Sequence, residues 1–194
     1  METAEVHLAR LSLQMAATAM QAAVAYNQAQ AALDLENVLS GERLTSQHGR
    51  AESRQTVVAL AELTKQHKAM FSNFMTKATS QMVAATGELP PEKRDRLAEQ
   101  WLASVNWNLS MQSQFYEGRE RWIAAASEAL TLANQHEEQL WLEDGQLVLS
   151  SDTLLTDLLA LVEIMDNVRE NEVAMFAERQ ARIAAAASRL AATP

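Results

Sequence analysis

Apolar side chains recur at three- and four-residue steps through most of this chain, a spacing typical of amphipathic helices. One phase runs from Leu97 through Trp101 and Phe115 to Leu132 without a slip. The stretches between such patterns are short, so we predict long helices rather than strands. The predicted helical stretches are residues 3–39, a segment within 50–85, about fifty residues from Pro91 onward, and residues 152–190.

Small and conformationally restricted residues mark the predicted helix ends. Ser40-Gly41 is expected to end the first helix, and the backbone order of residues 41–49 stays open. Pro91 suits a first helical turn, because its missing N–H is not needed there. Gly118 keeps the apolar phase, so the third helix is expected to continue through it, with or without a kink. A residue without a side chain at that position would also let a neighbouring backbone approach closely.

Residues 140–149 depart from the helical pattern. Apolar residues alternate on both sides of Asp144-Gly145, which is a common sequence signal for a tight β-hairpin. An isolated two-stranded hairpin is only marginally stable in water, so the alternative is a helix end at Gly145 followed by an apolar loop. The sequence favours the loop and leaves the hairpin open. Ser150, Ser151 and Asp152 then offer caps for the last helix.

The composition agrees with a helical chain. The protein has 194 residues, of which 48% are hydrophobic, with five Gly, three Pro and no Cys. Ala, Leu and Met favour helices, and this length is enough for one domain with a substantial core. The absence of cysteine excludes disulfides, thiolate metal sites and a cysteine nucleophile. We therefore predict an all-α protein, a single domain over residues 1–194 that forms an elongated antiparallel four-helix bundle.

The first predicted helix contains 23 consecutive uncharged residues, from Leu11 to Leu33, which is the length of a membrane span. The amides of Gln14, Gln21 and Gln28 would each cost several kcal/mol in hydrocarbon, so we expect packing against other helices instead. These glutamines repeat every seven residues beside small and apolar side chains. They form either a self-association seam, in which amides fix the register, or the polar edge of a bundle helix.

Negative charge is concentrated in one part of the chain. The formal net charge is −9, and residues 122–166 contain nine carboxylates and no Lys or Arg. Such a region repels nucleic acid and anionic lipid and attracts basic surfaces. It is either a solvated face or a partner-binding surface. In the second case, the candidate contact residues are Glu137, Glu138, Trp141, Asp144 and Leu147.

Familiar patterns of catalysis and metal binding are missing from the sequence. None of His7, His48, His67 and His136 has the partner spacing of a di-iron bundle or a helical zinc site. His67 and His136 continue apolar stripes, where each is either a core histidine or a ligand or pH-sensitive group. The chain also has no phosphate-binding glycine loop and no Gly-x-Ser-x-Gly motif. We expect no catalytic residue, no metal and no cofactor.

These features favour a non-enzymatic helical protein that assembles with itself, as a homo-oligomer, or docks a protein partner. One alternative is a membrane-active or surface-coating helical protein, such as a pore former or a lipid-granule coat, although the expected lipid-facing helices lack a basic polar face. A further alternative is a small-ligand sensor with a site near Trp101, Trp107 and Trp122. The first residues show no secretory signal, which predicts a cytoplasmic protein or export by a signal-independent route.

Overall fold

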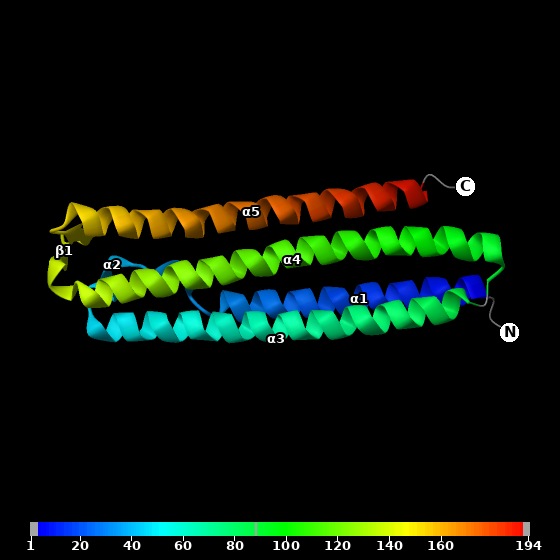
Figure 1. Cartoon of the computed structure of the whole chain (residues 1–194), viewed down its shortest axis with the longest axis horizontal. Helices are drawn as coiled ribbons and strands as arrows, with labels where there is room; N and C mark the ends of the chain where they lie inside the picture. The colour runs from blue at the N-terminus through cyan, green and yellow to red at the C-terminus, as the bar shows by residue number, and fades with distance from the viewer. Residues whose placement is uncertain (1–3, 88, 192–194) are drawn as a thin grey trace. The chain divides into compact units, whose positions relative to one another are not determined.

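The computed structural model describes residues 4–87 and 89–191, and it confirms that the chain is predominantly helical (Figure 1). Its longest helix has 45 residues, which corresponds to about 68 Å at 1.5 Å per residue. Within the described ranges, no helix has both the length and the apolar character needed to cross a membrane. The elements are α1 (Ala4–Ala31), the 3-10 turn η1 (Leu35–Asn37), α2 (Gly41–Leu44), α3 (Gln47–Thr86), α4 (Pro91–Gln135), η2 (Glu137–Gln139), β1 (Leu140–Glu143), β2 (Gln146–Leu149) and α5 (Asp152–Ala191).

The chain divides into two units. Unit 1 contains Met1–Leu35 and Val58–Ser113, and unit 2 contains Glu36–Val57 and Gln114–Pro194. Helix α1 therefore belongs to unit 1, whereas α2, both strands and α5 belong to unit 2. Helices α3 and α4 each contribute a part to both units.

In unit 1, helix α1 packs against α3 and the first part of α4. Tyr26, near the end of α1, has its ring centroid 4.5 Å from that of His67, in the middle of α3. Residues from the start of α1 share a core with residues from the end of α3, so the two helices run antiparallel. The buried members of this core are Leu8, Met15, Ala78, Met82, Ala85 and Leu89, and Leu11, Phe74, Leu97 and Trp101 pack against them.

Helix α1 ends earlier than the sequence pattern predicts. Its last residue is Ala31, so the prediction that Ser40-Gly41 ends this helix is wrong. The backbone tightens at Leu33, and Asp34 adopts a φ of 50°, a left-handed conformation that directs the chain out of the helix. Ser40 instead caps the start of α2, where its side-chain oxygen accepts a backbone N–H at 3.4 Å.

The other predicted boundaries of the long helices agree with the structure. Helix α3 ends at Thr86, directly before Gly87, and α4 begins at Pro91 and is continuous through Gly118. A Cβ atom built on Gly118 would lie 3.4 Å from Cγ1 of Val168 in α5. A side chain therefore occupies the space beside this glycine, whereas we expected a backbone.

Residues 140–149 form a β-hairpin, so the favoured prediction of a loop is wrong. Strands β1 and β2 are antiparallel, with a register that pairs Trp141 with Val148 and Leu142 with Leu147. Asp144 and the glycine after it have φ values of 50° and 78°. Two successive left-handed residues are what a two-residue type I′ hairpin turn requires.

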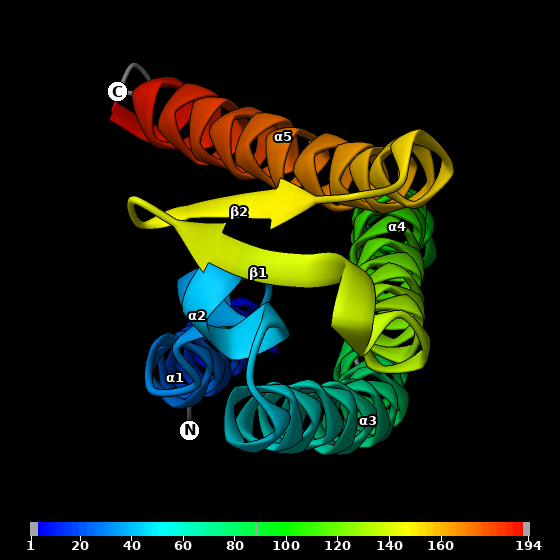
Figure 2. The same cartoon turned by 90° about the vertical axis from the view of Figure 1, so that its left-hand side faces the viewer.

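The hairpin is stable here because it is not isolated. Both strands contact α2, and β2 also contacts α5 (Figure 2). A Cβ atom on Gly41 of α2 would lie only 2.8 Å from Cδ2 of Leu142 and 3.4 Å from Cβ of Leu147. The argument against an isolated hairpin does not apply when a helix covers one of its faces. The sequence could not supply that information, because it gave no prediction for α2.

Helix α5 returns antiparallel to the second part of α4 (Figure 1). Its start is capped by Ser151, whose side-chain oxygen accepts the Leu154 N–H at 3.3 Å, as the sequence allowed. One stripe of α5 is buried in unit 2 at the helical period. Its fully buried members are Leu154, Leu158, Leu161 and Val168.

Candidate functional site

The glutamine series predicted as a seam lies on α1 in unit 1. Gln14, Gln21 and Gln28 are all exposed. Met15, which follows Gln14 by one residue, is instead buried in the unit 1 core. The glutamines therefore form a polar edge beside the buried stripe of α1, and their role in self-association stays a prediction.

The other predicted contact residues gather at one end of unit 2. Glu137 and Glu138 are exposed in η2, Trp141 is 42% exposed in β1, and Asp144 is exposed at the hairpin turn. Leu147 is half-buried in β2, where it lies over α2. These five residues therefore lie in unit 2, whereas Gln14, Gln21 and Gln28 lie in unit 1, and their role in partner binding stays a prediction.

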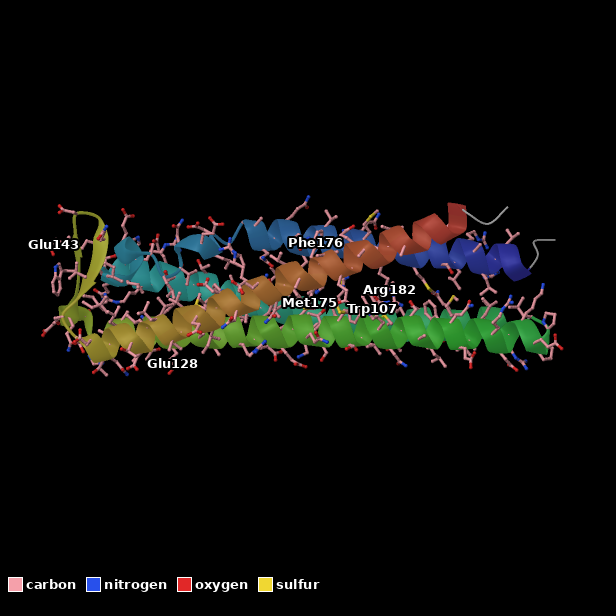
Figure 3. All side chains as sticks on the ribbon, turned by 90° about the horizontal axis from the view of Figure 1, so that it is seen from above. Trp107, Glu128, Glu143, Met175, Phe176 and Arg182 are labelled. Carbon is pink, nitrogen blue, oxygen red and sulfur yellow. The ribbon has the colours of Figure 1, made fainter. Side chains whose placement is uncertain are left out.

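The acidic region predicted at residues 122–166 lies entirely within unit 2. All nine of its carboxylate residues are exposed. They are distributed over the end of α4, the hairpin and the start of α5, and Figure 3 labels Glu128 on α4 and Glu143 on the hairpin. A distribution over several elements makes a broad negative surface rather than a compact cation site.

One carboxylate of that region is paired with a buried arginine. Arg50, in the first turn of α3, has a side chain that is 2% exposed, while the side chain of its partner Glu137 is 59% exposed. Arg50 Nη1 also donates to the Leu44 carbonyl at 2.9 Å, and Arg54 Nη2 donates to the Leu130 carbonyl at 3.4 Å. These contacts connect α2, α3, α4 and η2 within unit 2.

A second buried ion pair joins α4 to α5 in unit 2. Arg119 Nη2 lies 2.7 Å from Glu172 Oε2, and the two side chains are 8% and 19% exposed. Burial raises the pKa of the Glu172 carboxyl, and the charge of Arg119 opposes that rise only in part. The Arg119 guanidinium also lies 5.6 Å from the ring centroid of Phe115.

These polar groups carry no recognisable reaction chemistry. The described residues contain no group of three or more His, Asp and Glu that could hold a metal ion. A raised carboxyl pKa is common at active sites, but it also arises in structural ion pairs. Glu172 has Arg119 as its charged partner, and general acid–base catalysis would also need a substrate position beside the carboxyl. We therefore interpret both arginine pairs as structural.

The chain matches no protein-family model, no curated protein and no solved structure.

The aromatic residues of the sensor alternative are divided between the units. Trp101 packs against the unit 1 core and Trp107 is half-buried in the same unit, whereas Trp122 is buried in unit 2.

The most distinctive surface was not identified from the sequence. Helix α5 carries a second apolar series, displaced by one residue from its buried stripe and left exposed. Figure 3 shows Met175 and Phe176 on different sides of α5, and Phe176 is 62% exposed. We call the central part of this face the α5 stripe, which consists of the apolar residues Leu159, Val162, Val173 and Phe176 and of the charged residues Asp166 and Arg169 between them. Leu155 and Ile183 continue the same spacing beyond its two ends.

The spacing of the α5 stripe alternates between four and three residues, as in the seam of a coiled coil. Helix α1 carries a comparable exposed series in unit 1, where Val6, Leu13, Met20 and Val24 are each about half exposed or more. The sequence signal was present, since the start of α5 shows a broad apolar face. A sequence cannot indicate which half of a broad face the rest of the chain covers.

Proposed function

We propose that this protein is a non-enzymatic helical assembly protein, which acts by associating with other helices through its exposed faces. The observation that carries the proposal is the α5 stripe, because Leu159, Val173 and Phe176 are 57%, 65% and 62% exposed at coiled-coil spacing. Several exposed apolar side chains on one face of a helix commonly mark a site of protein association. A stripe of this period matches the surface of a second helix.

The exposed series of α1 supports the same function from unit 1. Leu13 is 72% exposed and Met20 is 67% exposed, seven residues apart on one face. Gln14 and Gln21 directly follow Leu13 and Met20 in sequence, and Gln28 continues the seven-residue repeat. In an interface, amides at this spacing would fix the register that small and apolar side chains leave loose. An antiparallel four-helix arrangement of α1, α3, α4 and α5 is part of this proposal.

The acidic region supports a role for protein partners over nucleic acid or anionic lipid. Its exposed carboxylates give unit 2 a negative field that repels both polyanions and favours basic protein surfaces. Glu138, Trp141 and Asp144 are accessible on this surface, so they are the candidate contacts of such a partner.

Light scattering over a range of protein concentrations tests the proposal. We expect a native mass above that of one 21.4 kDa chain. The substitution Phe176→Glu should lower that mass, because it puts a charge into an apolar seam, while Asn171→Glu at an exposed position off the α5 stripe should not. A chain that stays monomeric at all concentrations, and that retains no protein in affinity capture from its native cell, contradicts the proposal.

A further inference from the structure

We propose that the α5 stripe pairs with the α5 stripe of a second copy of this chain, in antiparallel orientation and in one register. This inference rests on the proposed assembly function and specifies its partner and its geometry. The evidence is the order of apolar and charged residues along the α5 stripe together with their exposure in unit 2.

The α5 stripe is available to a partner that does not displace α4. Leu159, Val162 and Arg169 each follow a buried residue of α5 by one position, which is a rotation of about 100° around the helix. The other three members, Asp166, Val173 and Phe176, follow residues that are half-buried. Leu158 is buried while Leu159 is 57% exposed, and Leu161 is buried while Val162 is 36% exposed. A second helix can therefore pack beside α5 while α4 keeps its own contacts in unit 2.

The two charged members of the α5 stripe determine the orientation of the partner. Asp166 and Arg169 occupy adjacent seam positions in the middle of the stripe, and both are exposed. In a parallel, in-register pair, Asp166 would face Asp166 and Arg169 would face Arg169 of the second copy. Both layers would then bring like charges together, which disfavours association.

An antiparallel pair with its two-fold axis between Asn167 and Val168 avoids that conflict. In antiparallel coiled coils each layer joins an a position of one helix to a d position of the other. With this axis, Asp166 faces Arg169 of the second copy, and the symmetry repeats the contact in the next layer. Both charges in the seam therefore gain a partner of opposite sign.

The same axis also pairs the apolar members. Val162 faces Val173 of the second copy, and Leu159 faces Phe176 of the second copy, so the six central positions have matching partners. Leu155 and Ile183 continue the spacing at the two ends, where they face Gln180 and Asp152 of the second copy, so the attraction comes from the central layers. Moving the register by one heptad in either direction places Asp166 and Arg169 against aliphatic or aromatic side chains. A charge opposite an apolar group is desolvated without compensation, so the alternative registers are disfavoured.

Repulsion at the edge of the seam limits the expected affinity. Glu163 and Glu170 border the α5 stripe on one side, and in the antiparallel pair Glu163 of each copy approaches Glu170 of the other. The Asp166–Arg169 layers also replace two apolar layers. We therefore expect a reversible dimer whose specificity comes from charge and whose attraction comes from the apolar layers.

A charge-reversal series measured by analytical ultracentrifugation tests the orientation. Asp166→Arg and Arg169→Asp should each weaken the dimer about tenfold or more, because each creates two like-charge layers. The double variant, with both substitutions, should return to within about threefold of the wild-type dissociation constant, since the two charges then only exchange places. Asp157→Arg, an exposed position off the stripe with the same charge change as Asp166→Arg, is the matched control and should leave the dimer unchanged.

Cysteine cross-linking tests the register independently, because the natural chain contains no cysteine. Val162→Cys and Val173→Cys chains should form a disulfide with each other when they are mixed and oxidised. Neither chain should cross-link with itself, because the two copies of each position are about 16 Å apart along the pair. Circular dichroism of every variant verifies that the helices are retained.

The outcomes separate this inference from the proposed function. A disulfide between two Val162→Cys chains, in a sample that contains only this variant, indicates parallel pairing and overturns the inference. So does a double charge reversal that fails to restore association, even if the protein remains oligomeric, in which case the assembly function stands on another face. A strictly monomeric wild-type chain overturns the dimer outright, and the partner-capture experiment then decides whether the assembly function survives.

Discussion

Removal of the exposed carboxylate of Glu137 is expected to destabilise the protein more than removal of the buried arginine that it binds. Arg50 is the buried partner, with a side chain 2% exposed, whereas the Glu137 side chain is 59% exposed. Replacing Glu137 with Gln leaves the buried guanidinium of Arg50 without a carboxylate to balance its charge. Breaking a buried ion pair in this way typically costs about 3–5 kcal/mol, and the exposure of Glu137 places the expected cost near 3 kcal/mol.

Replacing Arg50 with Met removes the buried charge itself. Glu137 then returns to water at little cost, and the methionine fills part of the volume. The remaining loss is the hydrogen bond to the Leu44 carbonyl, which spans 2.9 Å and is worth about 1–2 kcal/mol. The double variant should resemble Arg50→Met alone, because no unpaired buried charge is left for the second substitution to create.

Urea-induced unfolding followed by far-ultraviolet circular dichroism measures these differences in the free energy of unfolding. Glu138→Gln is the matched control, since Glu138 is the neighbouring exposed carboxylate of η2, and it should change the free energy by less than about 0.5 kcal/mol. If Glu137→Gln is as mild as this control, the Leu44 carbonyl alone satisfies Arg50 and the reasoning is refuted.

Four further substitutions test other parts of the fold. Burial raises the pKa of Glu172, so the folded state holds a proton that the unfolded state releases, and stability falls as pH rises through the raised pKa. Glu172→Gln should remove this fall, and parallel stability–pH curves for variant and wild type contradict the assignment. A Cβ on Gly49 would lie 2.5 Å from the Arg43 Cα, so Gly49→Ala should lower the free energy of unfolding by about 2–3 kcal/mol. Gly145→Ala meets no neighbour but has a φ of 78°, so it should cost only about 1 kcal/mol; equal losses in denaturant unfolding would argue against the close contact. Leu142→Ala should speed amide hydrogen exchange in the hairpin selectively, and unchanged exchange would show that α2 does not support it.

The long helices could be predicted because their signals are local. The apolar period, Gly87 and Pro91 determine the end of α3 and the start of α4, and these features need no knowledge of the rest of the fold. A single glycine costs only about 1 kcal/mol in a helix, so the phase of the neighbouring apolar residues outweighed Gly118.

The errors arose where distant segments decide the structure. The hairpin exists because α2 covers it, and α2 precedes it by about a hundred residues, so no local pattern could indicate the support. The end of α1 depends on the left-handed backbone of Asp34, a residue that the apolar pattern treats as an ordinary polar position. Arg50 and Arg119 lie at the helical spacing of the apolar residues in α3 and α4. This spacing was the sequence feature that could have indicated that both arginines are buried.

The α5 helix shows why a function based on surfaces is harder to predict than a fold based on cores. Its two stripes have the same period and differ by one residue, so the period alone does not tell which of them α4 covers. The charges of Asp166 and Arg169 interrupt the exposed stripe near its centre. That interruption reduces the continuous apolar surface that would promote non-specific aggregation of single chains. It also makes association depend on an arrangement in which both charges are paired, so the polar residues supply specificity while the apolar residues supply attraction.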